Sequence, residues 1–475
     1  MTDSIIIDPV TRVEGHAKVA ILLNEDSSVK EARFSVLDFR GFEKFMEGRP
    51  YYEMPMITAR SCGICSVSHL LASAKACDEI AGMRPPETVV LLRRLIHMGQ
   101  IIQSHSLNFF HLSSPDFLLG MDYDPEKRNL FGLIEKQPEL ARKGIRLRKF
   151  GQEIIERVAG RRIHASDWIV PGGAKWPLTN ENADYLLSLI PEALETTVNT
   201  LDMFTNWFER CIEEIETYGD FPSYYLGIVS EDGGLEHYDG KIRIMDNGGK
   251  IVADNIDPSK HDEYIGEAVE TWSYMKFPYY KPLGYPEGAY RVGPLARLNI
   301  SSNCGTPIAD EAFKEYKKLG KNGVTQSTFH YHLARLIEVL FCIEISKAIL
   351  ENPKALSQNV YNRSNVINTE GFGVLEAPRG TLMHHYQVDN HGIITKANMV
   401  IATEHNNIAY NRAVTQVAKR YVKADQLEEG MLNRVESVIR SFDPCLSCAT
   451  HAVGQMPLEI QLYNSDGKLI DRQVR

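Results

Sequence analysis

The chain has 475 residues with 52 basic and 62 acidic side chains, which gives a formal net charge of −10. This negative balance argues against a nucleic-acid partner, because binding to phosphates needs a basic face. No apolar run in the sequence approaches the roughly 20 residues that a membrane-spanning helix needs, and the N-terminus lacks the basic and apolar segments of a secretory signal. We therefore expect a cytoplasmic protein without a membrane span.

The first 40 residues are predicted to be rich in β-strands. Short runs that contain β-branched residues occur at 5–7, 17–23 and 32–37, and a polar turn at 24–28 separates the second run from the third. We expect this β-rich start, residues 1–40, to precede the helical part of the chain.

The rest of the chain is predicted to be mostly helical. Apolar side chains repeat at the spacing of an α-helix in four segments, at 91–102, 194–215, 333–340 and 427–438. They predict a bundle core over residues 85–220 and 326–440. Residues 220–325 are rich in Gly, Pro and Tyr and are expected to form loops and short strands, with a hairpin turn at 246–249. The predicted fold is α+β and mainly α: a long-helix bundle core, an N-terminal β region and a smaller β-containing insert, in a single domain over 1–475.

Four of the eight cysteines form two Cys-x-x-Cys pairs, Cys62 with Cys65 and Cys445 with Cys448. Each spacing lets two sulfurs of one turn converge on one ion, so the two turns together would supply four thiolates. Four soft thiolates select zinc, an iron–sulfur cluster or nickel. The second pair directly follows Asp443-Pro444, where the last helix is expected to end because the residue before proline avoids helical backbone.

The spacing of the two pairs leaves several kinds of site open. A structural zinc site usually separates its pairs by about 15–20 residues, whereas here hundreds of residues intervene. A thioredoxin-like dithiol would explain Cys62 and Cys65 alone, but it leaves the second pair unexplained. On spacing alone, an iron–sulfur cluster competes seriously with nickel.

The residues around both pairs resemble the two signatures of nickel–iron hydrogenase large subunits. Residues 60–69 read Arg-x-Cys-Gly-Ile-Cys-x-x-x-His, and residues 443–451 read Asp-Pro-Cys-x-x-Cys-x-x-His. Four more segments resemble family motifs in the same order along the chain, at 8–16, 40–44, 171–173 and 376–380. Ser61 stands where the family often has an aliphatic residue, at a position not expected to bind metal. The segments 40–50 and 445–452 are most similar to the cytoplasmic, NAD-reducing bidirectional branch.

This resemblance implies a nickel–iron centre whose iron carries carbon monoxide and cyanide, and an activity of reversible heterolytic H2 cleavage. Nickel would bind all four cysteines, with Cys65 and Cys448 also bridging to iron and Cys62 and Cys445 as terminal ligands. The Cys445 thiolate would take the proton, and Glu14 would relay it outward. A carboxylate suits that relay because burial can raise its pKa toward the working range. The plainer interpretation of Glu14 is a surface or salt-bridged carboxylate.

The same resemblance assigns roles around the centre. Arg379 would hold its guanidinium over the open metal position, bound by Asp116 and Asp443 through charge-assisted hydrogen bonds. Thr403 would hydrogen-bond a cyanide, and His69 a cysteine sulfur. Plainer interpretations are a surface arginine for Arg379 and a turn aspartate for Asp116.

A structural magnesium is also implied, bound by Glu43 and His451. Glutamate is a natural ligand for this hard cation, whereas histidine is a less usual one. Both side chains would otherwise simply be hydrogen-bonded. The remaining histidines of interest are expected to be buried or to lie at interfaces rather than to bind metal: His97, His105, His111, His384 and His385.

Maturation in this family cuts the chain after the last metal motif, which predicts a cut between His451 and Ala452 and a removable C-terminal tail over 452–475. A maturation protease and nickel-insertion factors are therefore expected partners. The plainer interpretation is that 458–462 forms a last strand.

Electrons must leave through other subunits, because the sequence shows no dinucleotide or phosphate loop and no third cysteine cluster. We expect a flavin-containing diaphorase that handles NAD, together with an iron–sulfur small subunit. NADP- or deazaflavin-linked hydrogenases share much of this pattern. A non-catalytic subunit related to respiratory complex I would lack the cysteine pairs, and a zinc scaffold would differ in metal content.

Overall fold

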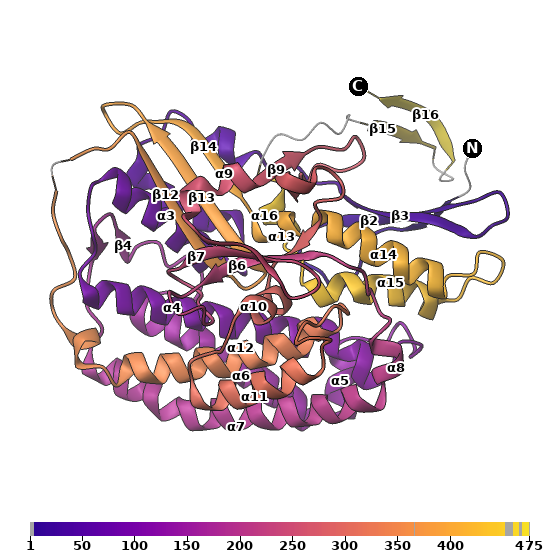
Figure 1. The fold of residues 1–475 in the computed structure, drawn as a ribbon, viewed down its shortest axis with the longest axis horizontal. Helices are drawn as coiled ribbons and strands as arrows, with labels where there is room; N and C mark the ends of the chain where they lie inside the picture. The colour runs from indigo at the N-terminus through magenta and orange to yellow at the C-terminus, as the bar shows by residue number, and fades with distance from the viewer. Residues whose placement is uncertain (1–3, 365, 452–458, 465–467, 475) are drawn as a thin grey trace.

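The computed structural model describes residues 4–364, 366–451, 459–464 and 468–474. Long helices stack along one side of the molecule, and small sheets with the C-terminal helices lie on the other side (Figure 1). The long helices are α4 (Glu87–Ser106), α6 (Pro138–Ala159), α7 (Asn180–Arg210) and α12 (His330–Leu350). Their arrangement confirms the predicted α+β, mainly α class with a helical core.

The bundle forms because apolar residues recur on the inner faces of its helices. Helix α12 is buried almost all round and packs against both α4 and α7, whereas α6 and α7 turn charged residues outward. Helices α4 and α6 approach closely at Gly99 and Gly151, where a Cβ on either glycine would lie 2.5–2.7 Å from the carbonyl oxygen of the other. Larger residues at this crossing would force the helices apart.

Short elements connect the long ones. The helical repeat predicted over 194–215 is interrupted at Cys211, between α7 and a separate short helix. The short elements are α1 (Phe42–Met46), α2 (Met54–Thr58), α5 (Leu130–Lys136), α8 (Ile212–Ile215), α9 (His261–Tyr264), β4 (Ile169–Val170) and β5 (Gly173–Ala174).

The N-terminal sheet contains β1 (Ser4–Ile7), β2 (Ala17–Leu23) and β3 (Val29–Val36), paired antiparallel in this order. Buried and half-buried residues alternate along β2, and β3 packs against α14 (Asn407–Tyr421). All three predicted strands are present, although the third begins at Val29, three residues earlier than the apolar run indicated.

The insert contains two sheets and three α-helices, of which α9 was given above. Its strands are β6 (Tyr224–Val229), β7 (Lys241–Met245), β8 (Ile251–Ile256) and β11 (Tyr290–Arg291) in one sheet, and β9 (Ile265–Ala268) with β10 (Phe277–Tyr280) in the other. The predicted hairpin turn at 246–249 joins β7 to β8, and the carboxylate of Asp246 accepts a hydrogen bond from the backbone N–H of Lys250 (2.9 Å). The expectation of loops and strands alone is wrong for α10 (Pro294–Ile300) and α11 (Pro307–Lys318). Both begin at a proline, whose fixed φ suits the first helical turn.

A further sheet lies on the helix that follows the first cysteine pair, and the prediction of a helical core over 326–440 is wrong for its three strands. The elements are β12 (Glu370–Ala377), β13 (Gly380–Val388), β14 (Ile394–Val400) and α3 (Ser66–Ile80). A Cβ on Gly371 would lie 2.0 Å from the carbonyl oxygen of Ala76, and one on Gly373 would lie 1.9 Å from that of Ala72. β12 therefore runs antiparallel to α3 at close range. This places the β12–β13 turn, which carries Arg379, beside the start of α3.

The C-terminal helices return to the same region. They are α13 (Ala402–His405), α14, α15 (Glu429–Phe442) and α16 (Leu446–Ala449). The apolar repeat predicted for this region begins at Leu427, but helix α15 begins only at Glu429. Leu427 is 48% exposed and is not part of the apolar face of the helix. The helix ends just before Asp443, as expected, but this residue adopts a left-handed conformation (φ 61°, ψ 59°) rather than the extended one usual before proline. The reversal turns the second cysteine pair inward.

Beyond the second cysteine pair, β15 (Glu459–Tyr463) and β16 (Leu469–Val474) pair as an antiparallel hairpin. A strand thus occupies most of the predicted segment 458–462, while Ala452, the first residue of the predicted removable tail, lies outside the described residues. Within the described ranges, no helix combines the length and apolar character that a membrane span requires.

Candidate metal centre

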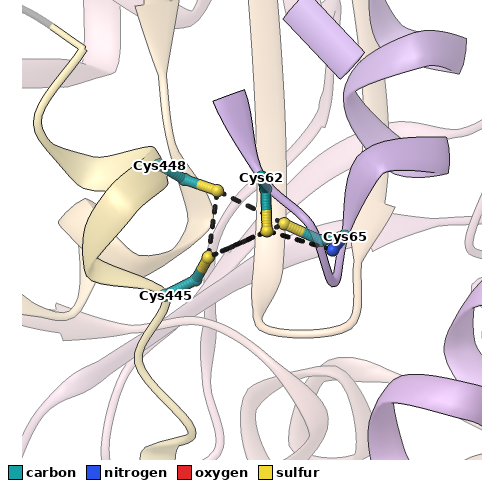
Figure 2. A group of neighbouring side chains, drawn as sticks. All are labelled: Cys62, Cys65, Cys445 and Cys448. Carbon is teal, nitrogen blue, oxygen red and sulfur yellow. Dashed lines mark hydrogen bonds between the residues drawn. The ribbon is translucent and has the colours of Figure 1, made fainter. Parts of the chain in front are cut away.

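The four cysteines of the two pairs meet at one point (Figure 2). Cys62 and Cys65 lie in the loop before α3, Cys445 directly precedes α16, and Cys448 lies within it. The Sγ–Sγ distances are 3.2 Å for Cys62–Cys445, 3.8 Å for Cys65–Cys445, 3.3 Å for Cys65–Cys448 and 3.0 Å for Cys445–Cys448. All four side chains are buried, and none forms a disulfide.

The geometry of these sulfurs fits a soft metal ion. Four thiolates placed tetrahedrally at about 2.3 Å from an ion would stand roughly 3.8 Å apart. The observed separations of 3.0–3.8 Å are close to that spacing. Across the part of the chain that the structure describes, this is the one group of three or more Cys, His, Asp or Glu side chains that converges in this way.

Backbone amides and the N-terminal segment fix the two cysteine turns. The Sγ of Cys62 accepts hydrogen bonds from the backbone N–H groups of Ile64 (3.2 Å) and Cys65 (3.1 Å), so the first turn wraps around its own sulfur. Glu14 lies beside the second turn. Its carbonyl oxygen accepts from the N–H of Leu446 (3.1 Å), and its carboxylate accepts from the N–H of Ser447 (3.0 Å). The segment around Glu14 contacts the second cysteine turn directly, and the sulfurs of the two turns meet beside it.

The pKa values of the cysteine thiols are shifted in different directions. Burial opposes charge on Cys62, yet hydrogen bonds from the other three thiols and the nearby charge of Arg379 hold the pKa of the Cys62 thiol well below its usual range. Burial and the neighbouring sulfurs raise the pKa of Cys445 and Cys448 well above that range. The protein alone thus stabilises one thiolate rather than four, and a bound metal ion would supply the charge that ionises the rest.

Arg379 lies over the cysteines. Its Nε donates to the carbonyl oxygen of Asp443 (2.5 Å) and its Nη2 to the Asp443 carboxylate (3.1 Å). Its Nη1 is buried and has no hydrogen-bond partner among the described residues. Burial alone would lower the pKa of Arg379, but the charges of Asp443 and of the cysteine sulfurs raise it well above its usual value. A narrow cavity joins this side chain to the sulfurs, lined by Arg379, Cys65, Cys445, Cys448, His69 and Thr403.

Asp116 does not hold Arg379, which corrects the sequence-based assignment. Its carboxylate instead accepts hydrogen bonds from Arg440 (2.8 Å) and Asn433 (3.2 Å) and pairs with Arg12. Only Asp443 of the two predicted aspartates binds Arg379 among the described residues. Asp116 therefore links the N-terminal segment to α15, one step away from the cysteines.

His69 and Thr403 both line the cavity, and His69 contacts a different group from the cysteine sulfur expected. The Nδ1 of His69 lies 3.2 Å from the Nε2 of His384, and within the described ranges no hydrogen bond joins His69 to a cysteine sulfur. Burial lowers the pKa of His69 to about 4, so its ring is neutral. Thr403 Oγ1 accepts a hydrogen bond from the backbone N–H of Cys445 (2.9 Å) and so positions that residue.

The remaining histidines do not belong to the converging group of cysteines among the described residues. His97 contacts the Glu376 carbonyl oxygen (2.9 Å), and His105 contacts the Glu338 carboxylate (2.8 Å). His111 is half-buried, His384 also contacts Tyr386, and His385 pairs with Glu370.

Glu43 and His451 come together, and the structure adds two oxygen groups that sequence reasoning missed. His451 Nε2 lies 3.6 Å from carboxylate oxygens of both Glu43 and Glu404, and 2.7 Å from the carbonyl oxygen of Met399. His451 Nδ1 lies 3.0 Å from the carbonyl oxygen of Cys448. Burial raises the pKa of Glu404 to about 7, and its Oε1 has no partner among the described groups.

Comparison with known proteins gives a consistent result. The family profile described as nickel-dependent hydrogenase matches residues 40–130 and 224–451, and a profile described as HoxL-like matches residues 4–39. The NAD-reducing hydrogenase HoxS subunit beta of Cupriavidus necator is 40% identical over 490 residues, which covers 100% of both chains. The matching chain of the vhc hydrogenase of Methanococcus voltae is 42% identical over 473 residues, covering 98% of each chain.

One solved structure extends this similarity to three dimensions. It is described as a NAD+-reducing NiFe hydrogenase in the H2-reduced state. It is 45% identical in sequence and superposes with a TM-score of 0.92, covering 95% of this chain and 100% of that chain. The bundle, the sheets and the two cysteine turns therefore correspond to a known arrangement.

Proposed function

Because the chain belongs to the nickel-dependent hydrogenase family, we propose that it is the catalytic subunit of a NiFe hydrogenase whose electrons reach NAD through partner subunits. The observation that carries this proposal is the buried set of four cysteine sulfurs beneath the unpartnered Nη1 of Arg379. A nickel–iron group with carbon monoxide and cyanide on its iron, bound there, would supply the redox chemistry of H2 cleavage. The thiolates of Cys62, Cys65, Cys445 and Cys448 would hold this group.

The Cys445 thiolate and Glu14 form the proton exit in this proposal. The main chains of these two residues pair with each other, and the Glu14 carboxylate reaches the backbone of the same turn. Glu14 is half-buried, so its carboxylate connects the enclosed cysteines with the surface. Once the Cys445 thiolate has taken up a proton, a carboxylate in this place can receive that proton from the resulting thiol and release it outward.

Arg379 and Thr403 act on the other side of the sulfurs. The Nη1 of Arg379 offers a fixed donor and a positive charge next to the open position, while Asp443 holds the guanidinium plane. Among the described contacts, the Thr403 hydroxyl accepts a hydrogen bond but donates none. It can therefore donate one to a cyanide on the iron.

We further propose a magnesium ion between Glu43, Glu404, His451 and the Met399 carbonyl oxygen. Both ring nitrogens of His451 face carbonyl oxygens, but a neutral imidazole carries only one N–H. With that proton on Nδ1, the Nε2 lone pair lies near two carboxylates and one carbonyl oxygen, and oxygen ligands of this kind suit a hard cation. The site would tie the residue that ends the second metal motif to β14 and α13.

The partners follow from the chemistry and from the relatives. The C. necator relative is a subunit of a NAD-reducing hydrogenase, and this chain requires an electron outlet. We propose a cytoplasmic complex with a flavin-containing diaphorase and an iron–sulfur small subunit. Nickel-insertion factors and a protease would complete maturation, and the protease would remove residues 452–475.

Metal analysis and infrared spectroscopy of the protein purified with its native partners test this function. We expect near-stoichiometric nickel and iron, carbonyl and cyanide bands, and H2-dependent reduction of NAD in preference to NADP or a deazaflavin. Zinc alone, or matured protein without metals and bands, would contradict the catalytic role. Reduction of NADP or the deazaflavin instead would contradict only the NAD link.

A further inference from the structure

Arg297 uses all five of its N–H groups inside the protein. It lies on α10, and its side chain is fully buried. Nε and Nη2 bind the two carboxylate oxygens of Glu338 (2.6 and 2.7 Å), and Nη1 binds the Glu376 carboxylate (2.8 Å). The two remaining N–H groups bind the carbonyl oxygens of Ala377 (2.9 Å) and Pro378 (3.2 Å). A guanidinium has five donors in a fixed plane, and here each has an acceptor.

Three of these five acceptors belong to the residues that directly precede Arg379. Arg297 therefore fixes one carboxylate and two successive carbonyl groups of the β12–β13 turn. Its bidentate pair with Glu338 anchors the guanidinium to the central helix α12. Through this one side chain, the turn that carries Arg379 is tied to the rigid bundle.

The remaining polar groups of Glu376 are also satisfied. Its backbone N–H donates to the His237 carbonyl oxygen (2.8 Å), and its own carbonyl oxygen contacts His97 (2.9 Å). Its second carboxylate oxygen accepts from the backbone N–H of Ile228 (3.0 Å) and from the Thr381 hydroxyl (2.7 Å). At Ala377 and Pro378 the Arg297 guanidinium binds two successive carbonyl oxygens, so it also holds the last two residues before Arg379.

We propose that Arg297 is a positioning residue for Arg379: it sets the turn from which the Arg379 guanidinium reaches the metal centre. This inference rests on the proposed function. Arg379 itself has two hydrogen bonds, both to Asp443, which fix its outer end. The inner end, where the side chain leaves the backbone, is fixed by Arg297. Both ends are needed to hold Nη1 toward the cavity.

Lysine at position 297 would test this role. It keeps the positive charge next to Glu338 and Glu376, but three N–H donors on one nitrogen cannot serve five acceptors spread around a planar fork. At least two acceptors then lose their donor. Misplacement of a catalytic group by about 1 Å can slow an enzyme about 100-fold, so we expect Arg297→Lys to lower kcat for H2 oxidation by about 10- to 100-fold.

Arg93→Lys is the matched control. Arg93 is also fully buried, pairs with the Asp78 carboxylate and donates to the backbone carbonyl oxygens of Val170 and Gly173. It lies on α4 and has no contact with the Arg379 turn among the described residues. The control measures what a general loss of a buried arginine does to stability.

The experiment uses the metal-loaded complex with Arg297→Lys, Arg379→Lys, the double variant and Arg93→Lys. We expect Arg297→Lys to retain nickel and iron, to shift the carbonyl and cyanide infrared bands in the same direction as Arg379→Lys, and to speed amide hydrogen exchange around residues 376–380. Arg93→Lys should leave the bands in place. If Arg297 acts through Arg379, the double variant should be no slower than Arg379→Lys alone.

Two results separate failure of this inference from failure of the proposed function. If Arg379→Lys changes neither rate nor bands, the proposed role of Arg379 is wrong. If Arg379→Lys slows the enzyme but Arg297→Lys does not, or if the two losses multiply, the positioning role is wrong. Should Arg297→Lys fail to fold, Glu376→Gln removes the charge that faces Nη1 while keeping the shape of the turn, and the same cycle with Arg379→Lys applies.

Discussion

Asp443 serves the centre through its charge and through its backbone, and three substitutions separate these contributions. Its carboxylate binds the buried Arg379, and its left-handed backbone turns the chain toward Cys445. Asn tolerates that conformation nearly as well as Asp, Gly adopts it freely, and Ala does not. Asn loses the negative charge but keeps an acceptor for Arg379, whereas Gly and Ala lose both the charge and the acceptor.

The expected loss of unfolding free energy follows from these differences. Asp443→Asn weakens one charge-assisted hydrogen bond and should lose about 1–2 kcal/mol. The new amide nitrogen would replace Asp443 Oδ2, which has no partner among the described residues. Asp443→Gly breaks a buried ion pair and should lose about 3–5 kcal/mol. Asp443→Ala adds about 1 kcal/mol for the left-handed backbone and should lose about 4–6 kcal/mol.

Urea unfolding of the metal-loaded protein under anaerobic conditions measures these values, with H2 oxidation recorded in parallel. Activity should follow the same order, with Asn the most active variant. If Ala were no worse than Gly, the backbone contribution would be wrong. If Gly were as mild as Asn, the hydrogen bond that the side chain at position 443 accepts from Arg379 would not matter.

Other predictions address the remaining parts of the site. Cys65→Ser should lose nickel and iron because a hydroxyl replaces a soft thiolate, whereas Cys77→Ser, whose buried thiol donates to a backbone carbonyl oxygen away from the centre, should keep both by elemental analysis. Glu14→Gln should keep its metals but oxidise H2 about 100- to 10,000-fold more slowly, and a near-normal rate would exclude the relay. Glu404→Gln should lower the magnesium content after dialysis. Burial holds the pKa of His97 at about 3, against about 6.5 when unfolded, so the unfolded chain takes up the proton first and stability falls as pH decreases from about 6.5 toward 3. His97→Gln should flatten this dependence in unfolding measurements.

The sequence carried the local parts of the site, because each cysteine pair and its neighbours are contiguous. Convergence of two pairs separated by most of the chain came from family resemblance rather than from spacing. The role of Asp116 was misassigned because several arginines lie within reach in the fold, and only packing decides between Arg379 and Arg440.

Glu404 and Arg297 were missed because no short motif connects them to their partners. Each is a charged residue within a largely apolar segment, and this pattern could have indicated a buried charge that needs a partner. In the structure both are fully buried, which forces them to find partners. The proline that begins α10 similarly suggested a loop, although it starts the helix that carries Arg297.

The centre joins the two ends of the chain, and this has a consequence for how the protein is made. An emerging polypeptide presents Glu14 and the first cysteine pair long before the second pair exists, so the complete cage can form only when synthesis is almost finished. A metal ion that then links Cys65 to Cys448 closes a loop of nearly the entire polypeptide. By the chain-entropy relation for cross-links, such a closure would stabilise the folded state by about 6 kcal/mol. The ion would therefore act as a clasp for the whole molecule, and its insertion would be a late step of folding as much as the start of catalysis.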